Sequence, residues 1–459
     1  MSPDRRLALT ASLALGGLIP TLAAAAGPRR NETAAPTRAA TGPELGVIPD
    51  APGDQSRSLQ AAIDKATERG VVLQLPAGRY LVRDLRLRPG SHLYGTAART
   101  SIALAGAGHL LSGDGAHGAR LDGLTLDGNG HQLAGGNRTG LVVLSGCRDI
   151  DLRDLTVLRS QANGLMLTRC SGRISDCRIT AITEAGIFSI DGTGLEITNN
   201  LVQDCANNGI LVWREKAGED GTIVSANRIE RMRAERGGSG EYGNGVNVYR
   251  AGNVLVTGNR IADCAYTAIR GNAASNIQMV ANSCSRLGEV ALYAEFGFEG
   301  ALIASNIVET AAAGISVTNF NEGGRLAVVQ GNLIRNLTRR EHEPVDKRGE
   351  GIAVEADAIV TGNTIENAPT AGIVVGWGHY MRDCAVTSNV IRNARVGIMI
   401  TRDPKAGAAL IAQNLISGVR EGAIRAMDKG VLVGPDLVKS GTSPSRITVQ
   451  GNMAVDPAA

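Results

Sequence analysis

The sequence predicts an all-β chain wound into a coil of short stacked strands, and three observations support this prediction. The first is a phrase that returns after about two dozen residues: apolar-x-x-Asn-x-apolar, then Gly-Ile-x-Val eight or nine residues later. The second is the alternation of apolar and polar residues over short runs rich in Val and Ile, which is typical of strands. The third is composition, because 59 of 459 residues are Gly without the three-residue period of collagen.

One clear copy of the phrase has Ile303, Asn306 and Val308 followed by Gly314. The same Asn recurs along the chain at Asn200, Asn227, Asn259, Asn282, Asn306, Asn332, Asn363, Asn389, Asn414 and Asn452. Earlier copies have Leu155 and Cys177 in its place. An Asn at one turn of every rung stacks the side-chain amides, which then bond to one another in a ladder. We therefore interpret these residues as turn residues and not as ligands.

The N-terminal residues have the features of a targeting segment. Residues 1–26 contain Arg5 and Arg6 near their start, continue with an apolar run and end in small residues, as in a signal peptide. The Arg pair fits the twin-arginine type, and a retained membrane anchor is the alternative. Residues 27–50 are rich in Ala, Pro, Thr and Gly and are expected to form a linker.

An amphipathic helix is expected next, because Leu59, Ala62, Ile63 and Ala66 fall on one helical face. Strands are expected at 71–75, 80–82 and 85–87, around a turn at 76–78. A stacked coil has an open apolar end, and a helix over that end prevents pairing with another chain. A long last interval, containing residues 430–445, is expected to cover the other end.

The helix followed by "LPAGRYLVRDLRL" resembles the N-terminal cap of the pectate-lyase-like right-handed parallel β-helix superfamily. With the twin-arginine signal and the Asn repeat, the chain resembles the twin-arginine-translocated repeat proteins. This resemblance implies an all-β, right-handed parallel β-helix of about a dozen rungs with an N-terminal amphipathic cap helix, in a single domain over residues 51–459. The catalytic signatures of the superfamily are absent from the sequence, so the resemblance implies no catalytic residue.

Two long inserts break the regular spacing between the turn Asn and the following Gly. The interval from Asn227 to Gly245 is eighteen residues and that from Asn332 to Gly351 is nineteen, against eight or nine in most other turns and sixteen from Leu124 to Gly140. Inserts at equivalent places in a repeat emerge on one face. These two are four rungs apart, roughly 19 Å at 4.8 Å per rung. We expect them to wall a groove whose floor is the strand after each Gly position.

The floor of this groove is formed by the second and fourth residues after each Gly, or after the Ala that replaces it. Between the inserts these are Asn247 and Tyr249, Arg270 and Asn272, Tyr293 and Glu295, Ser316 and Thr318, and Ala353 and Glu355. The same positions are mostly apolar in the rungs outside. Trp213 and Trp377, the chain's two Trp residues, lie near the edges of the patch. This polar and aromatic patch is the candidate site.

The patch suits a polysaccharide, since Tyr and Trp faces stack on sugar rings while Asn, Arg and Glu bond hydroxyls or carboxylates. In a lyase or epimerase, Arg270 would neutralise a uronate carboxylate while Tyr293 or Tyr249 removes a proton. In an inverting hydrolase, Glu295 and Glu355, roughly 9–10 Å apart, would be acid and base. The residues expected to bind substrate are Asn247, Tyr249, Asn272, Thr318, Trp213 and Trp377.

The competing hypothesis is a non-catalytic structural or adhesive repeat protein, periplasmic or on the cell surface. The net charge of +3, or about +2 once residues 1–26 are removed, excludes a strongly basic nucleic-acid binder. No membrane contact is expected beyond the signal peptide, and no cofactor is expected. His342 between Glu341 and Glu343 could hold a divalent ion, but alternating charges favour a solvated loop, so no metal is expected.

Overall fold

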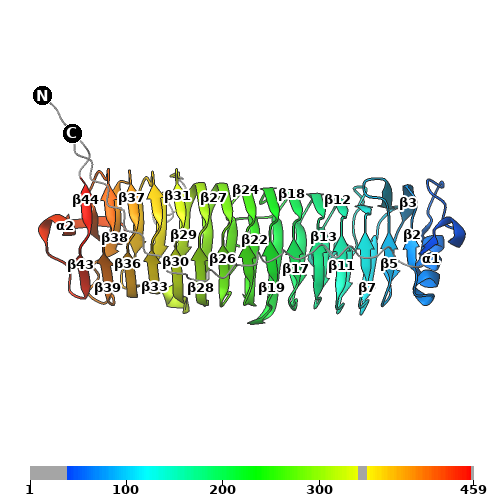
Figure 1. The fold of residues 1–459 in the computed structure, drawn as a ribbon, viewed down its shortest axis with the longest axis horizontal. Helices are drawn as coiled ribbons and strands as arrows, with labels where there is room; N and C mark the ends of the chain where they lie inside the picture. Colours follow the sequence, from blue (N-terminus) through cyan, green and yellow to red (C-terminus); the bar gives the residue numbers. More distant parts are fainter. Residues whose placement is uncertain (1–38, 340–348, 456–459) are drawn as a thin grey trace, which may run out of the picture. The chain divides into compact units, whose positions relative to one another are not determined.

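The computed structural model describes residues 39–339 and 349–455, which fall in one compact unit. The predicted fold class is confirmed: the unit is a parallel β-solenoid of about fourteen turns (Figure 1). The expected signal peptide, residues 1–26, and the candidate ion-binding residues Glu341, His342 and Glu343 lie outside the described residues.

Each turn of the solenoid contributes strands to three stacks, which we name A, B and C. Stack A is one parallel sheet of sixteen strands. Its strands are β1 Ala39–Thr41, β2 Val72–Gln74, β5 His92–Tyr94, β8 Arg120–Asp122, β11 Ile150–Arg153, β14 Gly172–Ser175, β17 Glu196–Thr198, β20 Ile223–Ser225, β23 Leu255–Thr257, β26 Ile277–Val280, β28 Glu299–Ala304, β30 Arg325–Gln330, β33 Ala356–Thr361, β36 Arg382–Thr387, β39 Ala409–Ala412 and β43 Ile447–Gln450.

Stacks B and C are two faces of one 28-stranded sheet, joined by the long strands β27 Ser283–Glu295 and β29 Ile307–Val317. Stack B also contains β3 Gly78–Val82, β6 Thr100–Leu104, β9 Thr125–Asp127, β12 Thr156–Ser160, β15 Arg178–Ile182, β18 Leu201–Cys205, β21 Arg228–Met232, β24 Arg260–Cys264, β31 Leu333–Arg335, β34 Thr364–Glu366, β37 Val390–Arg392, β40 Leu415–Ser417 and β44 Met453–Val455. Stack C also contains β4 Leu85–Leu87, β7 Leu111–Asp114, β10 Gly140–Ser145, β13 Asn163–Thr168, β16 Ala185–Ile190, β19 Asn208–Glu219, β22 Asn244–Gly252, β25 Ile269–Asn272, β32 Glu350–Val354, β35 Ala371–Val375, β38 Val396–Thr401 and β41 Ile424–Asp428, to which β42 Val431–Asp436 pairs antiparallel.

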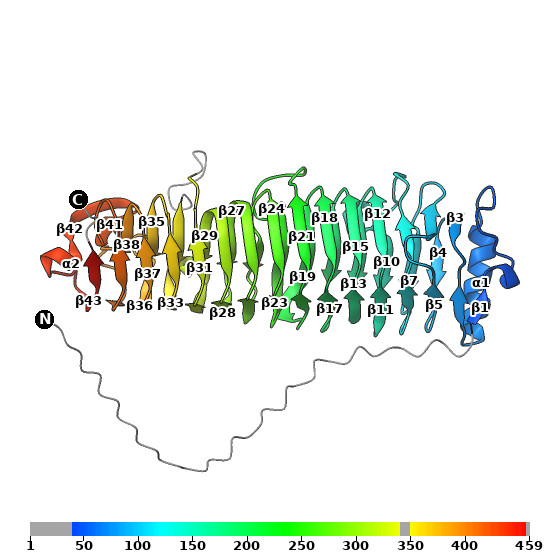
Figure 2. The ribbon, with the colours of Figure 1, turned by 45° about the horizontal axis from the view of Figure 1, so that its top comes forward.

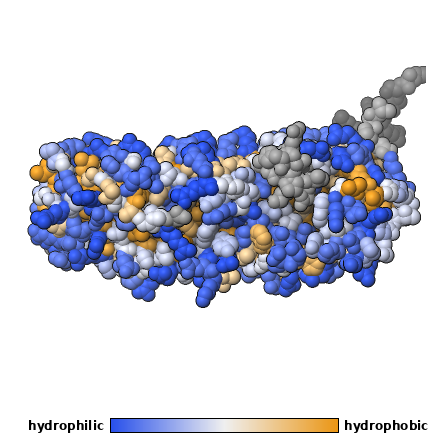
Figure 3. All heavy atoms as spheres, turned by 180° about the vertical axis from the view of Figure 1, so that it is seen from behind, coloured by the Kyte–Doolittle hydropathy of each residue, from blue (hydrophilic) through white to orange (hydrophobic). Residues whose placement is uncertain are grey.

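Apolar side chains from all three stacks fill the interior of the solenoid. Inward residues of stack C lie directly above one another, as Ile269, Leu292 and Ile315 do on successive turns. Burial of this continuous core stabilises the solenoid, because each turn removes the apolar face of its neighbours from water. Figure 3 shows that one face of the outer surface is mostly hydrophilic, with apolar side chains in scattered areas.

The predicted Asn ladder is confirmed. The side chain of Asn282 donates to Val256 O at 2.9 Å and to Asn306 Oδ1 at 3.1 Å, and its Oδ1 accepts from the backbone and side-chain nitrogens of Asn259. The same pattern continues through the other nine Asn residues to Asn452. At the other end of the ladder, the backbone nitrogen of Cys177 donates to Asn200. Each amide thus satisfies buried backbone groups at a turn that would otherwise lack partners.

The recurring Gly at the start of stack C strands has a steric cause. A Cβ added at Gly314 would lie 2.4 Å from the carbonyl oxygen of Gly351 on the next turn. Such a contact is shorter than any real Cβ tolerates, so the backbones approach this closely only when no side chain intervenes. The Gly column therefore belongs to the fold and not to the candidate site.

Both ends of the solenoid carry a helix (Figures 1 and 2). At the N-terminal end, α1 Ser56–Glu68 buries Leu59, Ala62, Ile63 and Ala66, which confirms the predicted cap helix. At the C-terminal end, α2 Leu437–Ser440 buries Leu437. Among the described residues, no helix combines the length and hydrophobicity required to cross a membrane.

The structure differs from the expected linker, residues 27–50, in the part that it describes. Residues 39–41 form β1, which pairs parallel with β2, and the 3-10 helix η1 Pro43–Leu45 follows. The segment has no internal hydrophobic period, but it completes stack A by bonding to a strand about thirty residues later. Pairing of this kind depends on its partner and is not encoded in local composition.

The seven cysteines are all buried and all free thiols. Burial raises the pKa of Cys205 and of Cys284 to about 12, so both thiols stay protonated at neutral pH. Cys205 and Cys284 therefore pack as apolar groups and do not present nucleophiles.

Candidate functional site

A pocket of about 490 Å³ opens on the outer side of stack C, on the turns from β25 to β35. We call it the main pocket. The described residues that line it are Ser239, Arg270, Glu289, Tyr293, Glu295, Phe296, Ser316, Thr318, Asn319, Glu350, Ala353, Val354, Glu355, Val374, Gly376 and Trp377. Six of these, Arg270, Tyr293, Glu295, Thr318, Glu355 and Trp377, were predicted from the sequence as catalytic or substrate-binding residues.

The parallel register of stack C brings these side chains together. Arg270 pairs with Tyr293, which pairs with Ser316, which pairs with Ala353. The register also places Glu295 beside Asn272, and the residues that follow Val317 and Val354, Thr318 and Glu355, continue the same column. Glu295 and Glu355 are therefore two turns apart, roughly 9–10 Å at 4.8 Å per turn.

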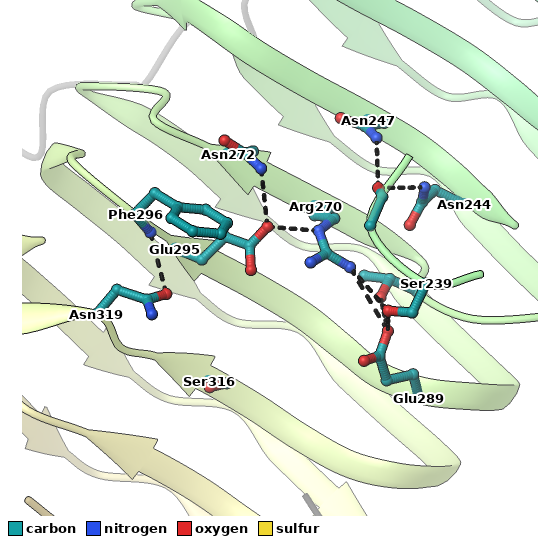
Figure 4. A network of polar contacts seen from close by, with 12 residues as sticks. Ser239, Asn244, Asn247, Arg270, Asn272, Glu289, Glu295, Phe296, Ser316 and Asn319 are labelled. Carbon is teal, nitrogen blue, oxygen red and sulfur yellow. Dashed lines mark hydrogen bonds and ion pairs between the residues drawn. The ribbon is translucent and has the colours of Figure 1, made fainter. Parts of the chain in front are cut away.

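Arg270 is the centre of a buried ionic network (Figure 4). Its Nε donates to Glu295 Oε1 at 2.6 Å, and its Nη1 lies 3.5 Å from Glu289 Oε2. Its guanidinium also lies over the ring of Tyr293, 4.9 Å from the centroid. Arg270 is 5% exposed, Glu289 1% and Glu295 2%. Charged side chains buried to this degree destabilise the folded state unless they form ion pairs and hydrogen bonds.

The first insert closes over this network. Ser239 Oγ donates to Glu289 Oε2 at 2.5 Å and accepts from Arg270 Nη1 at 3.3 Å. The insert is held in turn by the floor, since Asn247 Nδ2 and Asn244 Nδ2 both donate to Gly240 O. Its position is therefore fixed by bonds to stack C and does not depend on local sequence alone.

The burial of Arg270 and Glu295 differs from the expectation that both meet a substrate on the groove floor. Their strands do present them outward, as predicted, but the insert and neighbouring side chains cover them. The accessible part of the main pocket lies farther toward the C-terminal turns. There Thr318, Glu355 and Trp377 are partly exposed, and Phe296 is 40% exposed. The backbone nitrogen of Phe320, at the start of η3 Phe320–Glu322, donates to Glu355 Oε2 at 2.7 Å.

Four residues expected to bind substrate are placed differently. Trp213 and Tyr249 pair with each other on β19 and β22 and do not line the main pocket. Asn247 is buried beneath the insert, and Asn272 Nδ2 donates to Glu295 Oε1 at 3.0 Å. The two Asn side chains support the network, and they are not on the pocket surface. The sequence correctly predicted which positions face outward. Whether an outward side chain is exposed depends on whether the first insert covers it.

The lining residues that were not predicted from the sequence include three polar ones, Ser239, Glu289 and Glu350. Glu350 immediately precedes a column Gly, at the place held by Asn208 and Asn244 on earlier turns. This position also faces outward and is often polar, so it was a readable signal. No periodic signal marks Ser239 or Glu289, because Ser239 lies in the insert and Glu289 at a register shift in β27.

The geometry separates the chemical alternatives. The guanidinium of Arg270 already bonds to Glu295 and lies beside Glu289, so it is not available to neutralise a uronate carboxylate. Tyr249 is outside the main pocket, and the ring of Tyr293 is 4% exposed beneath Arg270. The lyase or epimerase arrangement is therefore disfavoured. Glu295 and Glu355 both line the main pocket. Within residues 39–339 and 349–455, no three His, Cys, Asp or Glu residues are grouped to hold a metal ion.

Comparison with solved structures identifies many that share this fold at low sequence identity. The catalytic unit of a GH87 α-1,3-glucanase from Streptomyces thermodiastaticus is 16% identical over 91% of this chain and 69% of its own, with a TM-score of 0.50. The A-module of a mannuronan C-5 epimerase from Azotobacter vinelandii is 16% identical over 90% and 100%, with a TM-score of 0.44. The surface adhesin PfbA of Streptococcus pneumoniae is 13% identical over 84% and 93%, with a TM-score of 0.46.

Among curated proteins, no sequence matches this chain significantly. The model of the right-handed β-helix region matches residues 105–229 and 216–391, which is more than half of the 459 residues. The match agrees with the parallel solenoid and with the repeated Asn and Gly columns. The chain therefore belongs to the right-handed β-helix family.

Proposed function

We propose that this protein binds a polysaccharide in the main pocket. The observation that carries the proposal is the combination, in one pocket on stack C, of the partly exposed rings of Trp377 and Phe296 with the partly exposed carboxylate of Glu355. Aromatic rings stack on the apolar faces of sugars, and carboxylates accept hydrogen bonds from their hydroxyls. The glucanase and the epimerase that share the fold also act on polysaccharides, by their names.

The substrate that fits best is a polymer of neutral sugar units. Arg270 is the guanidinium among the described lining residues, and it is held by Glu295 and Glu289. The lining therefore offers acceptors for hydroxyl groups in preference to a cation for a uronate. If the protein cleaves its ligand, the partly exposed Glu355 supplies one of the two carboxyl groups that an inverting hydrolase requires. Glu295, which is 2% exposed and bonded to Arg270, is not available as the other.

A glycan array that contains neutral and uronate polysaccharides tests the proposal. We expect the wild-type protein to bind a neutral glycan, and Trp377→Ala to weaken binding at least tenfold because the stacking surface is lost. Tyr94→Ala is the matched control, since Tyr94 is an exposed aromatic on stack A and lies outside the main pocket. Equal binding by wild type and Trp377→Ala would remove the main pocket from the proposal.

Reducing-end release from the bound glycan distinguishes catalysis from adhesion. A hydrolase is expected to lose product formation by about 10²–10⁴-fold in Glu355→Gln, with binding retained. Binding without product in the wild type would assign the protein to the adhesive alternative. Binding of uronate polymers, together with the ultraviolet absorbance of unsaturated products, would contradict the preference for neutral sugar units.

We further propose that the protein is exported through the twin-arginine pathway to the periplasm or beyond, as in the twin-arginine-translocated repeat proteins. The support is the Arg5–Arg6 pair before the apolar run of residues 7–22. Replacing both by Lys is expected to retain the protein in the cytoplasmic fraction. Unchanged export of that variant would contradict this route.

A further inference from the structure

A second pocket, of about 240 Å³, opens on the outer side of the same stack, on the N-terminal side of the first insert. Its floor comes from β16 and β19, where Phe188 and Leu211 are buried although they point away from the solenoid interior. The outer face of stack C is therefore apolar and aromatic here, in contrast to the ionic network two turns later.

An aromatic cluster gives this pocket a rigid surface. Trp213 meets Phe188 edge to face, with ring centroids 5.0 Å apart and planes at 79°, and meets Tyr249 at 5.5 Å and 62°. These contacts fix the indole, which is partly exposed and lines the second pocket. The indole Nε1 is buried and has no hydrogen-bond partner among the described residues. A preorganised indole of this kind offers a stacking face at little entropic cost.

Polar groups are fixed at the rim of the second pocket. Glu184 forms an ion pair with Arg236 at 2.5 Å and accepts a hydrogen bond from Asn207 Nδ2 at 3.0 Å. Burial raises the pKa of Glu184, and the nearby Arg236 opposes this shift. The rim thus combines fixed donors and acceptors with the aromatic surface, which is the combination that recognises a sugar ring with its hydroxyls.

The first insert contributes to both pockets. Arg236 and Tyr242 line the second pocket, whereas Ser239 lines the main pocket and bonds to Glu289. Asn208 Nδ2 also donates to Glu241 O, which attaches the insert to the floor of the second pocket. The nearest floor residues of the two pockets, Leu211 and Arg270, are two turns apart, roughly 10 Å at 4.8 Å per turn.

We propose that the second pocket is a further subsite for the same neutral polysaccharide chain, in which a sugar unit stacks on Trp213. This inference depends on the proposed function of the main pocket. One extended polymer lying along stack C would pass the insert and occupy both pockets. Two linked subsites raise the affinity for long oligomers far more than for a disaccharide, because the second contact is intramolecular.

The two Trp residues of the chain make a direct test, because each lines one pocket. Trp377→Phe leaves Trp213 as the reporter of the second pocket, and Trp213→Phe leaves Trp377 as the reporter of the main pocket. The probes are glucan, mannan, galactan and xylan oligosaccharides, each as a disaccharide and as a long oligomer. We expect a long oligomer to change the emission of both reporters. Its affinity for Trp213→Ala should fall more than tenfold, while affinity for Tyr94→Ala is unchanged.

The outcomes separate this inference from the proposed function. A change in the emission of Trp377 alone, with equal affinity of the wild type and Trp213→Ala for long oligomers, would overturn the second subsite. The proposal for the main pocket would not be affected by that result. A change at neither reporter with any probe would overturn both. Glu184→Gln keeps the aromatic cluster intact. This variant should also weaken binding of the long oligomer if Trp213→Ala acts through the pocket and not through misfolding.

Discussion

Asn282→Ala is expected to lower the free energy of unfolding by about 3–6 kcal/mol. The side chain of Asn282 is 1% exposed, donates to Val256 O and Asn306 Oδ1, and accepts from Asn259. Its removal leaves at least two buried polar groups without partners, each at a cost of roughly 1–3 kcal/mol. Chemical denaturation of the wild type and the variant measures the effect.

Asn321→Ala is the matched control for this prediction, because Asn321 is an exposed residue of η3 outside the ladder, and its backbone conformation is one that Ala also adopts. It should change the unfolding midpoint little. If the unfolding midpoint of Asn282→Ala differs from that of the wild type by no more than the midpoint of the control does, the stabilising role of the ladder is contradicted. Because repeats unfold partly in sections, the comparison of midpoints is safer than a single two-state fit.

Arg270→Met is expected to destabilise the protein by about 3–5 kcal/mol, since it leaves Glu289 and Glu295 buried beside an uncharged side chain. The double variant Arg270→Met/Glu295→Gln should recover part of this loss, because one of the two buried negative charges is removed. Thermal unfolding of the single and double variants forms a double-mutant cycle that measures the coupling.

Stability of Arg270→Met equal to the wild type would show that the network is not the ionic cluster described above. The expected loss also limits what the variant says about function. A protein without Arg270 that no longer binds glycan has lost the support of Glu295 and of the first insert through Ser239. Trp377 and Glu355, which are partly exposed, are therefore better probes of binding.

The fold was predictable because it repeats. The Asn and Gly columns each reflect one local constraint, an amide that bonds at a turn or a backbone that excludes a Cβ, and that constraint recurs on every turn. The cap helix was predictable from the spacing of Leu59, Ala62, Ile63 and Ala66. In contrast, β1 pairs with a strand that only the folded chain brings near, and composition alone indicated a linker.

The candidate site was predictable only in its outline. Strand alternation correctly placed Arg270, Tyr293, Glu295 and Glu355 on one outward face. Whether each side chain is free or covered depends on how the first insert folds over stack C, through bonds such as that of Asn247 to Gly240. Those bonds link residues without any period.

The position of Trp213 shows the same limit. Its rung lies before the first insert, so the sequence placed it at the edge of a single groove. In the structure the insert stands between two pockets, and Trp213 packs with Phe188 and Tyr249 on the far side. The division of the face into two pockets follows from the insert's tertiary contacts and could not be read from spacing.

The most direct test of the central claim is the structure of the protein with a neutral oligosaccharide that the glycan array selects. We predict that a sugar unit lies in the main pocket, stacked on Trp377 and bonded to Glu355, with the Arg270–Glu295 pair unbroken beneath it. An oligosaccharide that binds elsewhere on the solenoid and leaves the main pocket empty would contradict the account.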